Sequence, residues 1–389
     1  MSSHIKIVVA PQAFKGTASA SLVANAIINA LTKAVPNALV IPTPIADGGG
    51  GTVEALVTSS NGRLVNSETL DPIGRPIEAT WGILGDGTTA VIESAAASGL
   101  ALLKPSEYNP ELTSTKGTGL LIKEVLDKGY KNLLIGLGDS ATNDGGVGLG
   151  RALGIIPIND TGNEIPEGGA ALSTLHSFDT SNVHPSLAEL KITVLCDVKN
   201  TLCGPNGSSH IFGPQKGASP EQISKLDLAL AHFAQVVKTQ FHKDVIDMPG
   251  AGAGGGLGAG LVALCNATLK PGFDVISKSI KLPKIIKEAD VVITGEGRID
   301  ESTPGGKGVA GIAQIAKSNG VKSVLAIVGS SDLEPNKYKD IGIDGVFALN
   351  QSKEDPIPSP ERTPSLIEKT TTLAIKALIT DERNVTRDR

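Results

Sequence analysis

The chain has 389 residues, of which 40% are hydrophobic and 19% charged, a balance that favours a globular protein of about two domains and excludes a disordered one. A formal charge of −5 without clustered Lys and Arg argues against a nucleic-acid partner. No apolar stretch reaches the ~18 residues of a membrane span, and the start carries no signal-peptide pattern. Three cysteines without C-x-x-C spacing favour neither a zinc site nor disulfides, so we expect a cytoplasmic location.

The first part of the chain alternates strands and helices. An apolar run at 5–10 predicts a strand, and a periodic segment that Ser19 or Ser21 can cap predicts the helix after it. A second strand is expected at 38–45. From 63 to 93 the runs alternate and are divided by turn residues, which indicates a small antiparallel patch.

The middle and end of the chain return to regular strand–helix units. Helices are expected at 117–128 and 221–241, and buried strands at "NLLIGL" and "ITVLCDV". After "ADVVITGEG" the strands and helices alternate cleanly to the last helix, "SLIEKTTTLAIKALI". Such repetition predicts an α/β fold with mostly parallel sheets and helices on their faces.

The segment 135–150, "IGLGDSATNDGGVGLG", joins a strand to many glycines and small polar residues. Ligands in open α/β sheets bind where strands end and helices begin, so this stretch is a candidate binding loop. The hydroxyls of Ser140 and Thr142 are suited to phosphate or substrate oxygens. For Asp144 two interpretations stay open, a metal ligand or a simple cap of the following helix.

Three further segments place charged groups beside glycines at strand ends. Lys15 follows the first strand, Asp47 precedes four glycines, and Asp197 ends "ITVLCDV". For Lys15 the alternative is a solvated lysine, and His210 is expected to be a surface or packing histidine. The G-x-G-x-x-G at 250–255 has no strand before it, which favours an anion-binding helix start or an active-site loop over a dinucleotide site.

The last cluster, "ITGEGRIDESTPGGKG", puts two carboxylates and two cations between a strand and a helix. Such groups can clamp Mg²⁺, a phosphate or a substrate carboxylate. The alternative is an ion-pair network that only fixes the loop. The cluster consists of Glu296, Arg298, Asp300 and Lys307.

Taken together, these segments resemble the bacterial-type glycerate kinase family, whose members phosphorylate D-glycerate with ATP. The resemblance runs over nearly the whole chain and rests on seven motifs. They are "APQAFKG", "PIADGGGGT", "GLGDSATNDGGVG", "DVKNTLCGPNG", "FGPQKGA", "GAGAGGGLG" and "DVVITGEGRID".

The resemblance implies a Rossmann-like domain built from both chain ends, residues 1–72 plus 275–389, with a second α/β domain, residues 73–274, inserted between them. It places the active site in the cleft between the two domains. The implied partners are glycerate and ATP with Mg²⁺, without nucleic acid or membrane, and a homo-oligomer is an open alternative. The family favours 2-phosphoglycerate as the product.

Carried onto this sequence, the resemblance implies the following site. The expected catalytic residues are Asp197, Asp47 and Lys15, with Asp197 and Asp300 as the expected Mg²⁺ ligands. Substrate is expected to contact Phe14, Lys15, Arg298 and Asp300. Phosphate or nucleotide is expected at Gly138, Ser140, Thr142, Asn143, Asp144, Gly252, Gly255, Gly256, Lys216 and Glu296.

The chain departs from the family pattern in the first loops. Gln12 and Ala13 stand where the family has aspartate and serine, and Gly50 stands where it has glutamate. The glycine pair before the serine loop is Gly138–Asp139, and "ESTPGGKGVAG" follows the last motif. Losing a catalytic acid or base typically lowers a rate by about 10² to 10⁴. The alternative function is therefore a weak or silent relative that still binds a small organic acid or nucleotide.

Overall fold

The computed structural model describes residues 5–387 except 15, 47, 302, 304–307 and 351–358. The chain divides into two compact units. The first holds residues 1–47, 54–60 and 273–389, and the second holds residues 48–53 and 61–272. Both units combine helices with mostly parallel sheets, which confirms the predicted α/β class.

Parallel strands from both ends of the chain form the sheet of the first unit, in the order β13-β12-β11-β1-β2. β1 lies between β11 and β2, where Ile7 is opposite both Val291 and Val40. The apolar runs at both chain ends thus form one buried sheet, as parallel strands require. The strands are β1 (Lys6–Pro11), β2 (Leu39–Pro42), β11 (Val291–Ile299), β12 (Ser323–Ser331) and β13 (Gly345–Ala348).

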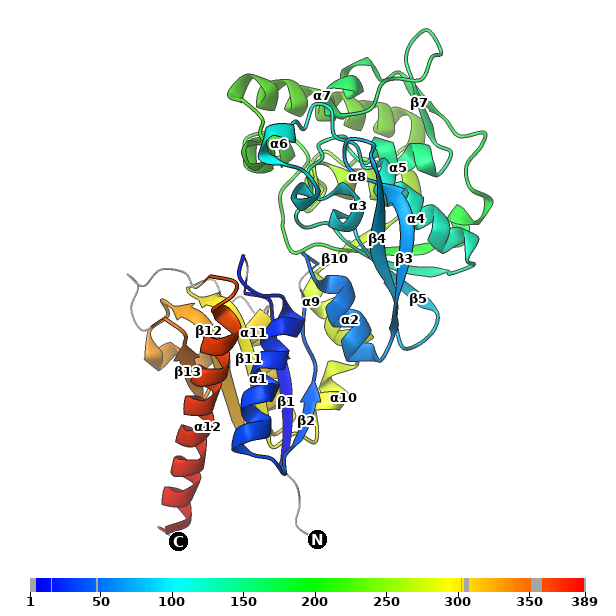
Figure 1. Cartoon of the computed structure of the whole chain (residues 1–389). Helices are drawn as coiled ribbons and strands as arrows, with labels where there is room; N and C mark the ends of the chain where they lie inside the picture. Colours follow the sequence, from blue (N-terminus) through cyan, green and yellow to red (C-terminus); the bar gives the residue numbers. More distant parts are fainter. Residues whose placement is uncertain are drawn as a thin grey trace. The chain divides into compact units, whose positions relative to one another are not determined.

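Helices α1 (Ala20–Ala34) and α12 (Thr363–Arg387) pack against each other beside this sheet (Figure 1). Ile27 and Ile367 are both fully buried in a shared cluster with strand residues such as Val9. Of the two serines expected to cap α1, Ser19 is the cap, because its hydroxyl accepts a hydrogen bond from the Leu22 N–H (3.2 Å). The other helices around this sheet are α2 (Thr52–Ser60), α9 (Gly272–Ser279), α10 (Leu282–Ile286) and α11 (Gly308–Ser318).

The sheet of the second unit has the order β10-β9-β6-β5-β4-β3. β4 pairs antiparallel with both β3 and β5, which confirms the expected antiparallel patch, and β5, β6, β9 and β10 are parallel to one another. A separate pair, β7 (Ile156–Ile158) and β8 (Ser177–Asp179), was not predicted. The main strands are β3 (Arg63–Leu70), β4 (Pro76–Ile83), β5 (Thr89–Glu93), β6 (Asn132–Gly136), β9 (Lys191–Leu195) and β10 (Thr268–Lys270).

Local sequence signals explain where the helices of the second unit begin. The longest, α7 (Pro220–Phe241), has a complete capping box, in which Ser219 and Gln222 bond each other's backbone, and Pro at its first position. Its inward face buries Phe233 and Leu230 in the core. The other helices are α3 (Ala95–Ser98), α4 (Lys116–Asp127), α5 (Val147–Ala152), α6 (Ser208–Phe212) and α8 (Leu257–Cys265).

The division differs from the expectation chiefly in two segments. Residues 48–53 and 61–72, which the resemblance assigned to the terminal domain, belong to the second unit. For residues 61–72, the reason is that β3 pairs with β4 along its whole length, from Arg63 opposite Ile83 to Leu70 opposite Pro76. Among the described residues, no helix has the length and apolarity needed to cross a bilayer.

Candidate active site

The predicted binding loop follows β6 and leads into α5. Ser140, Thr142, Asn143 and Asp144 are all buried, while Gly138 before them is half-buried. The Gly138 N–H donates to the Gly48 carbonyl (3.2 Å), so the loop lies against the glycine run at 48–51 within the second unit. The structure therefore brings two of the predicted glycine segments together.

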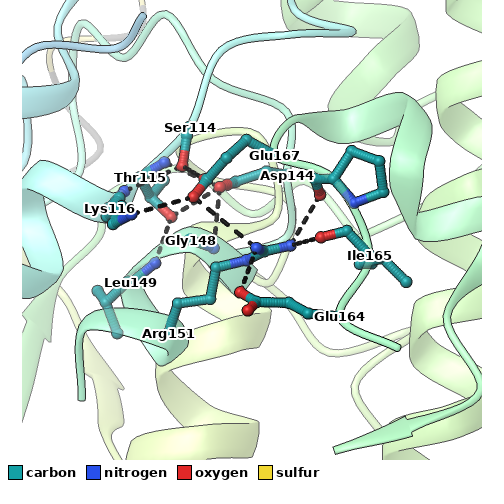
Figure 2. A network of polar contacts seen from close by, with 11 residues as sticks. Ser114, Thr115, Lys116, Asp144, Gly148, Leu149, Arg151, Glu164, Ile165 and Glu167 are labelled. Atoms are coloured by element: carbon teal, nitrogen blue, oxygen red, sulfur yellow. Dashed lines mark hydrogen bonds and ion pairs between the residues drawn. The ribbon is translucent and has the colours of Figure 1, made fainter. Parts of the chain in front are cut away.

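Asp144 organises this loop. Its carboxylate accepts hydrogen bonds from the Thr115 N–H and hydroxyl (both 2.8 Å) and from the Gly148 N–H (3.2 Å) (Figure 2). It also accepts one from the Gly146 N–H (3.1 Å). These bonds cap α5 and fix the start of α4, so the capping interpretation is confirmed. Burial raises the pKa of Asp144, and the hydrogen bonds oppose that shift.

Lys216 is the most deeply buried cation of this region, with 1% of its surface exposed. Its ammonium donates to the Ser140 hydroxyl (2.9 Å) and to the Thr142 carbonyl (2.7 Å). Burial lowers the pKa of Lys216 to about 7, and the charge of Asp144 opposes that shift. The structure thus brings the lysine predicted to bind phosphate to the predicted loop. There it binds one side chain, Ser140, and one backbone carbonyl, that of Thr142.

Three buried polar atoms near this lysine have no hydrogen-bond partner among the described residues. They are Thr142 Oγ1, Asn143 Oδ1 and Ser208 Oγ. Asn143 uses only its amide NH₂, which donates to the Ser209 hydroxyl (3.0 Å). Because an unpaired buried polar atom costs roughly 1 to 3 kcal/mol, Thr142 Oγ1 and Asn143 Oδ1 are free hydrogen-bonding capacity of the loop, and Ser208 Oγ is that of α6.

The glycine segment 250–256 packs against the same loop. A Cβ at Gly255, whose φ is +75°, would lie 1.8 Å from the Thr142 carbonyl oxygen, and the Gly145 N–H donates to the Gly255 carbonyl (3.1 Å). Gly252 and Gly256 are also buried. No strand occurs in 242–256, so the dinucleotide fingerprint lacks its context. Close backbone packing explains these glycines, and their contact with phosphate stays a prediction.

Asp197 follows β9 at the same sheet edge. β9 pairs with β6 up to Leu195 opposite Gly136, so the loop after β6 and the segment carrying Asp197 leave neighbouring strand ends. Asp197 is half-buried, and its carboxylate accepts a hydrogen bond from the Gly272 N–H (3.2 Å). This is the position from which a carboxylate can reach a ligand bound at the strand ends.

In the first unit, the predicted cluster lies at the ends of β11 and β12. Arg298 donates to Asp332 (2.6 Å from Nε), and its Nε is 4.0 Å from Asp300. The Thr303 hydroxyl donates to Glu296 (3.3 Å). Because β11 and β12 are adjacent parallel strands, their ends bring these groups together. The ion-pair alternative is thus realised, although the Arg298 side chain remains 64% exposed and accessible to a ligand.

The remaining predicted residues of the first unit have mixed outcomes. Phe14 is 2% exposed and packs in the hydrophobic core, so packing alone explains an aromatic residue at this position. The Gln12 N–H donates to the Gly295 carbonyl (2.7 Å), which ties the first loop to β11. Lys15, Asp47 and Lys307 lie outside the described residues, so their roles stay predictions.

The described residues contain no group of three or more His, Cys, Asp or Glu side chains arranged to hold a metal ion. Magnesium in kinases is usually held by one or two carboxylates together with phosphate oxygens and water, so such a group is not needed. The half-buried carboxylate of Asp197 is a donor of the type that Mg²⁺ prefers. The residues present therefore fit this ion.

Sequence reasoning missed several residues that shape the site. Asp139 accepts the Gly50 N–H (3.1 Å), and Glu93 accepts the N–H groups of Gly51 (3.2 Å) and Val53 (2.6 Å), which fixes the glycine run. Thr115 bonds Asp144 and Asp332 bonds Arg298, but each lies about 30 residues away from its partner in the chain. Only Asp139, inside the quoted loop motif, carried a local signal.

Arg151 on α5 is a further missed residue. Figure 2 shows its guanidinium donating to Glu164 (2.6 Å) and to the carbonyls of Ile165 (2.5 Å) and Pro166 (2.7 Å). Glu167 in the same segment accepts a hydrogen bond from Ser114, which immediately precedes Thr115. The network thereby joins α5, the start of α4 and residues 164–167.

His210, as expected, is a surface histidine. Its side chain is 38% exposed and lies beside Asp227.

Comparison with known proteins shows which family this chain resembles. The model of the glycerate kinase family matches residues 7–379. Glycerate 2-kinase of Escherichia coli is 46% identical over 89% of this chain and 90% of its own length, and glycerate kinase of Bacillus subtilis is 44% identical over the same shares. A crystal structure described as a candidate glycerate kinase 2 from Salmonella typhimurium LT2 covers 98% of this chain and 100% of its own, with a TM-score of 0.85 and 40% identity.

Proposed function

Because the chain belongs to the glycerate kinase family, we propose that it transfers the γ-phosphoryl group of ATP to D-glycerate and forms 2-phosphoglycerate. One structural observation carries this proposal beyond family membership. The buried loop held by Lys216 and the carboxylate of Asp197 leave adjacent strand ends at one sheet edge, where α/β proteins bind ligands.

Phosphoryl transfer needs positioning and charge stabilisation more than covalent chemistry by the protein. We assign the phosphates to the loop at 138–146, because the Thr142 hydroxyl can donate a hydrogen bond and has no partner among the described residues. Lys216 supports this loop through Ser140 and the Thr142 carbonyl. Gly252, Gly255 and Gly256 of the neighbouring segment are proposed to lie beside the phosphates, with the Gly255 N–H as the donor, since the N–H groups of Gly252 and Gly256 already donate to the carbonyls of Asn200 (3.2 Å) and Gly252 (3.4 Å).

Asp197 is the proposed general base. It would accept the proton of the attacking glycerate hydroxyl while the oxygen bonds to the γ-phosphorus and ADP leaves. Asp47 and Asp300 are the proposed supporting carboxylates. Asp197 and Asp300 would also hold Mg²⁺, which when bound neutralises charge on the phosphates.

The carboxylate of glycerate is assigned to cations of the first unit. Arg298 is exposed and presents a planar guanidinium, which suits bidentate binding of a carboxylate. Lys15 is the second proposed cation. In this assignment the phosphate groups bind residues of the second unit, and glycerate binds residues of the first.

The function is tested by incubating purified protein with ATP, Mg²⁺ and D-glycerate and identifying the product by phosphorus NMR. The proposal predicts 2-phosphoglycerate and ADP in equal amounts. A product phosphorylated at the 3-position would contradict the assigned hydroxyl. Binding of ATP or glycerate by calorimetry without any turnover would contradict the proposed activity and favour a silent binding protein.

The proposed setting is the cytoplasm, where ATP is available and thiols remain reduced. The three cysteines agree with this, since none forms a disulfide in the described part of the chain and burial raises the pKa of Cys203 and Cys265 to about 12. Glycerate and ATP are the proposed partners.

A further inference from the structure

A groove of about 740 Å³ lies in the first unit, between α9, α10 and α11. Its volume is within the range of small-molecule sites, roughly 300 to 1,000 Å³. None of its lining residues is among the predicted catalytic or substrate-binding residues. The groove therefore represents a feature that the proposed reaction does not use.

Three lysines rim this groove at intervals of three residues, Lys278, Lys281 and Lys284. All are exposed, and none has an ion pair or a side-chain hydrogen bond to any described residue. Elsewhere in the unit lysines do pair, for example the exposed Lys33 with Glu368 (2.9 Å) and the half-buried Lys317 with Asp344 (2.6 Å). Three like charges this close in the sequence repel one another, and a bound anion would relieve that repulsion.

The rest of the lining is suited to a ligand that is partly apolar. Pro283 and the half-buried Ile315 provide apolar surface, and Gln314 and Ser277 provide neutral polar groups. The lining contains one carboxylate, Asp274, in the first turn of α9, where the helix dipole stabilises it. With three lysines against this one carboxylate, the lining has an excess of positive charge.

From these observations we propose that the groove between α9, α10 and α11 is a second binding site, which takes a small organic phosphate. The lysine ammonium groups would bind the phosphate oxygens, since Lys is an established phosphate ligand as a point charge. Pro283 and Ile315 would contact the carbon skeleton. A long polyanion such as a nucleic acid is disfavoured, because the chain as a whole is acidic.

Phenyl phosphate is the probe, because it joins one phosphate to one apolar ring. Calorimetry at low ionic strength should show saturable binding that is several-fold tighter than that of inorganic phosphate. Neutralising the groove by Lys278→Gln, Lys281→Gln and Lys284→Gln together should weaken binding at least tenfold. Hydrogen exchange should slow in 273–286 and 308–318 when the probe is added.

The matched control is Lys287→Gln, the next lysine of the same three-residue series, which does not line the groove. It should change the affinity by less than about twofold. Thermal unfolding confirms that each variant is folded. Equal binding by the triple variant and the natural chain would overturn the proposal, and so would exchange protection confined to other segments. Tighter binding of inorganic phosphate than of phenyl phosphate would refute the organic ligand.

Discussion

The strand ends of the two units present charge in opposite ways. In the second unit, Lys216 and Asp144 are buried with 1% of their surface exposed, and Gly255 lies directly against the Thr142 backbone. In the first unit, Arg298 is 64% exposed and pairs with Asp332 in contact with solvent. In the second unit, the buried charges fix the loop, and their removal from water costs free energy. In the first unit, the exposed guanidinium of Arg298 remains available to a ligand. Changes in the buried loop should therefore alter stability, and changes at Arg298 should alter function alone.

The largest effect is expected at Gly255. In Gly255→Ala the new methyl group would overlap the Thr142 carbonyl, and the positive φ adds strain, so we expect a loss of about 3 to 5 kcal/mol in the free energy of unfolding or failure to fold. Gly87→Ala is the control, because Gly87 has a similar φ of +70° and open space around it. It should lose only about 1 kcal/mol. Urea denaturation measures both, and equal losses would contradict the interlocked packing.

The second prediction concerns Lys216 and pH. Its pKa is lowered to about 7 in the folded state, so between pH 7 and 9 the unfolded chain binds more protons at this residue, and stability rises with pH. The slope for one fully buried group approaches 1.4 kcal/mol per pH unit, or roughly 2 to 3 kcal/mol over this window. Lys216→Met should remove this rise. Urea denaturation at several pH values measures it, and an unchanged slope would show that Lys216 is not buried as described.

A third prediction addresses the proposed substrate cation. Arg298→Ala should raise the KM for glycerate about 10- to 100-fold, because a charge-assisted hydrogen bond to the carboxylate is lost. Asp332→Ala should raise the KM for glycerate by less than Arg298→Ala does, because it removes only the partner of Arg298 and leaves the guanidinium in place. A tenfold or larger rise of the KM for ATP instead would show that Arg298 binds the nucleotide.

The smallest effect is expected on stability in the first unit. Removing the exposed Arg298–Asp332 pair should cost no more than about 1 kcal/mol, because exposed ion pairs contribute little. A double-mutant cycle with Arg298→Ala and Asp332→Ala measures the coupling. A coupling above about 2 kcal/mol would remove the contrast between the two units.

The sequence predicted most of the framework, because apolar runs and capping residues are local signals. β1, β6, β9 and β11 follow such runs, and the Asp144 cap was one of two local interpretations. The sequence did not predict that Lys216 is buried, since its partners Ser140 and Thr142 lie far away in the chain. Nor did it predict Asp332 beside Arg298, which depends on the pairing of β11 with β12.

The most direct test of the proposed chemistry is the turnover of Asp197→Asn with ATP, Mg²⁺ and D-glycerate. Asp160→Asn, at an exposed turn of the same unit, is the matched control. If Asp197 accepts the hydroxyl proton, its variant should remain folded and lose about 10² to 10⁴ in kcat, while the control keeps the natural rate. A folded Asp197→Asn protein with the natural kcat would contradict this account.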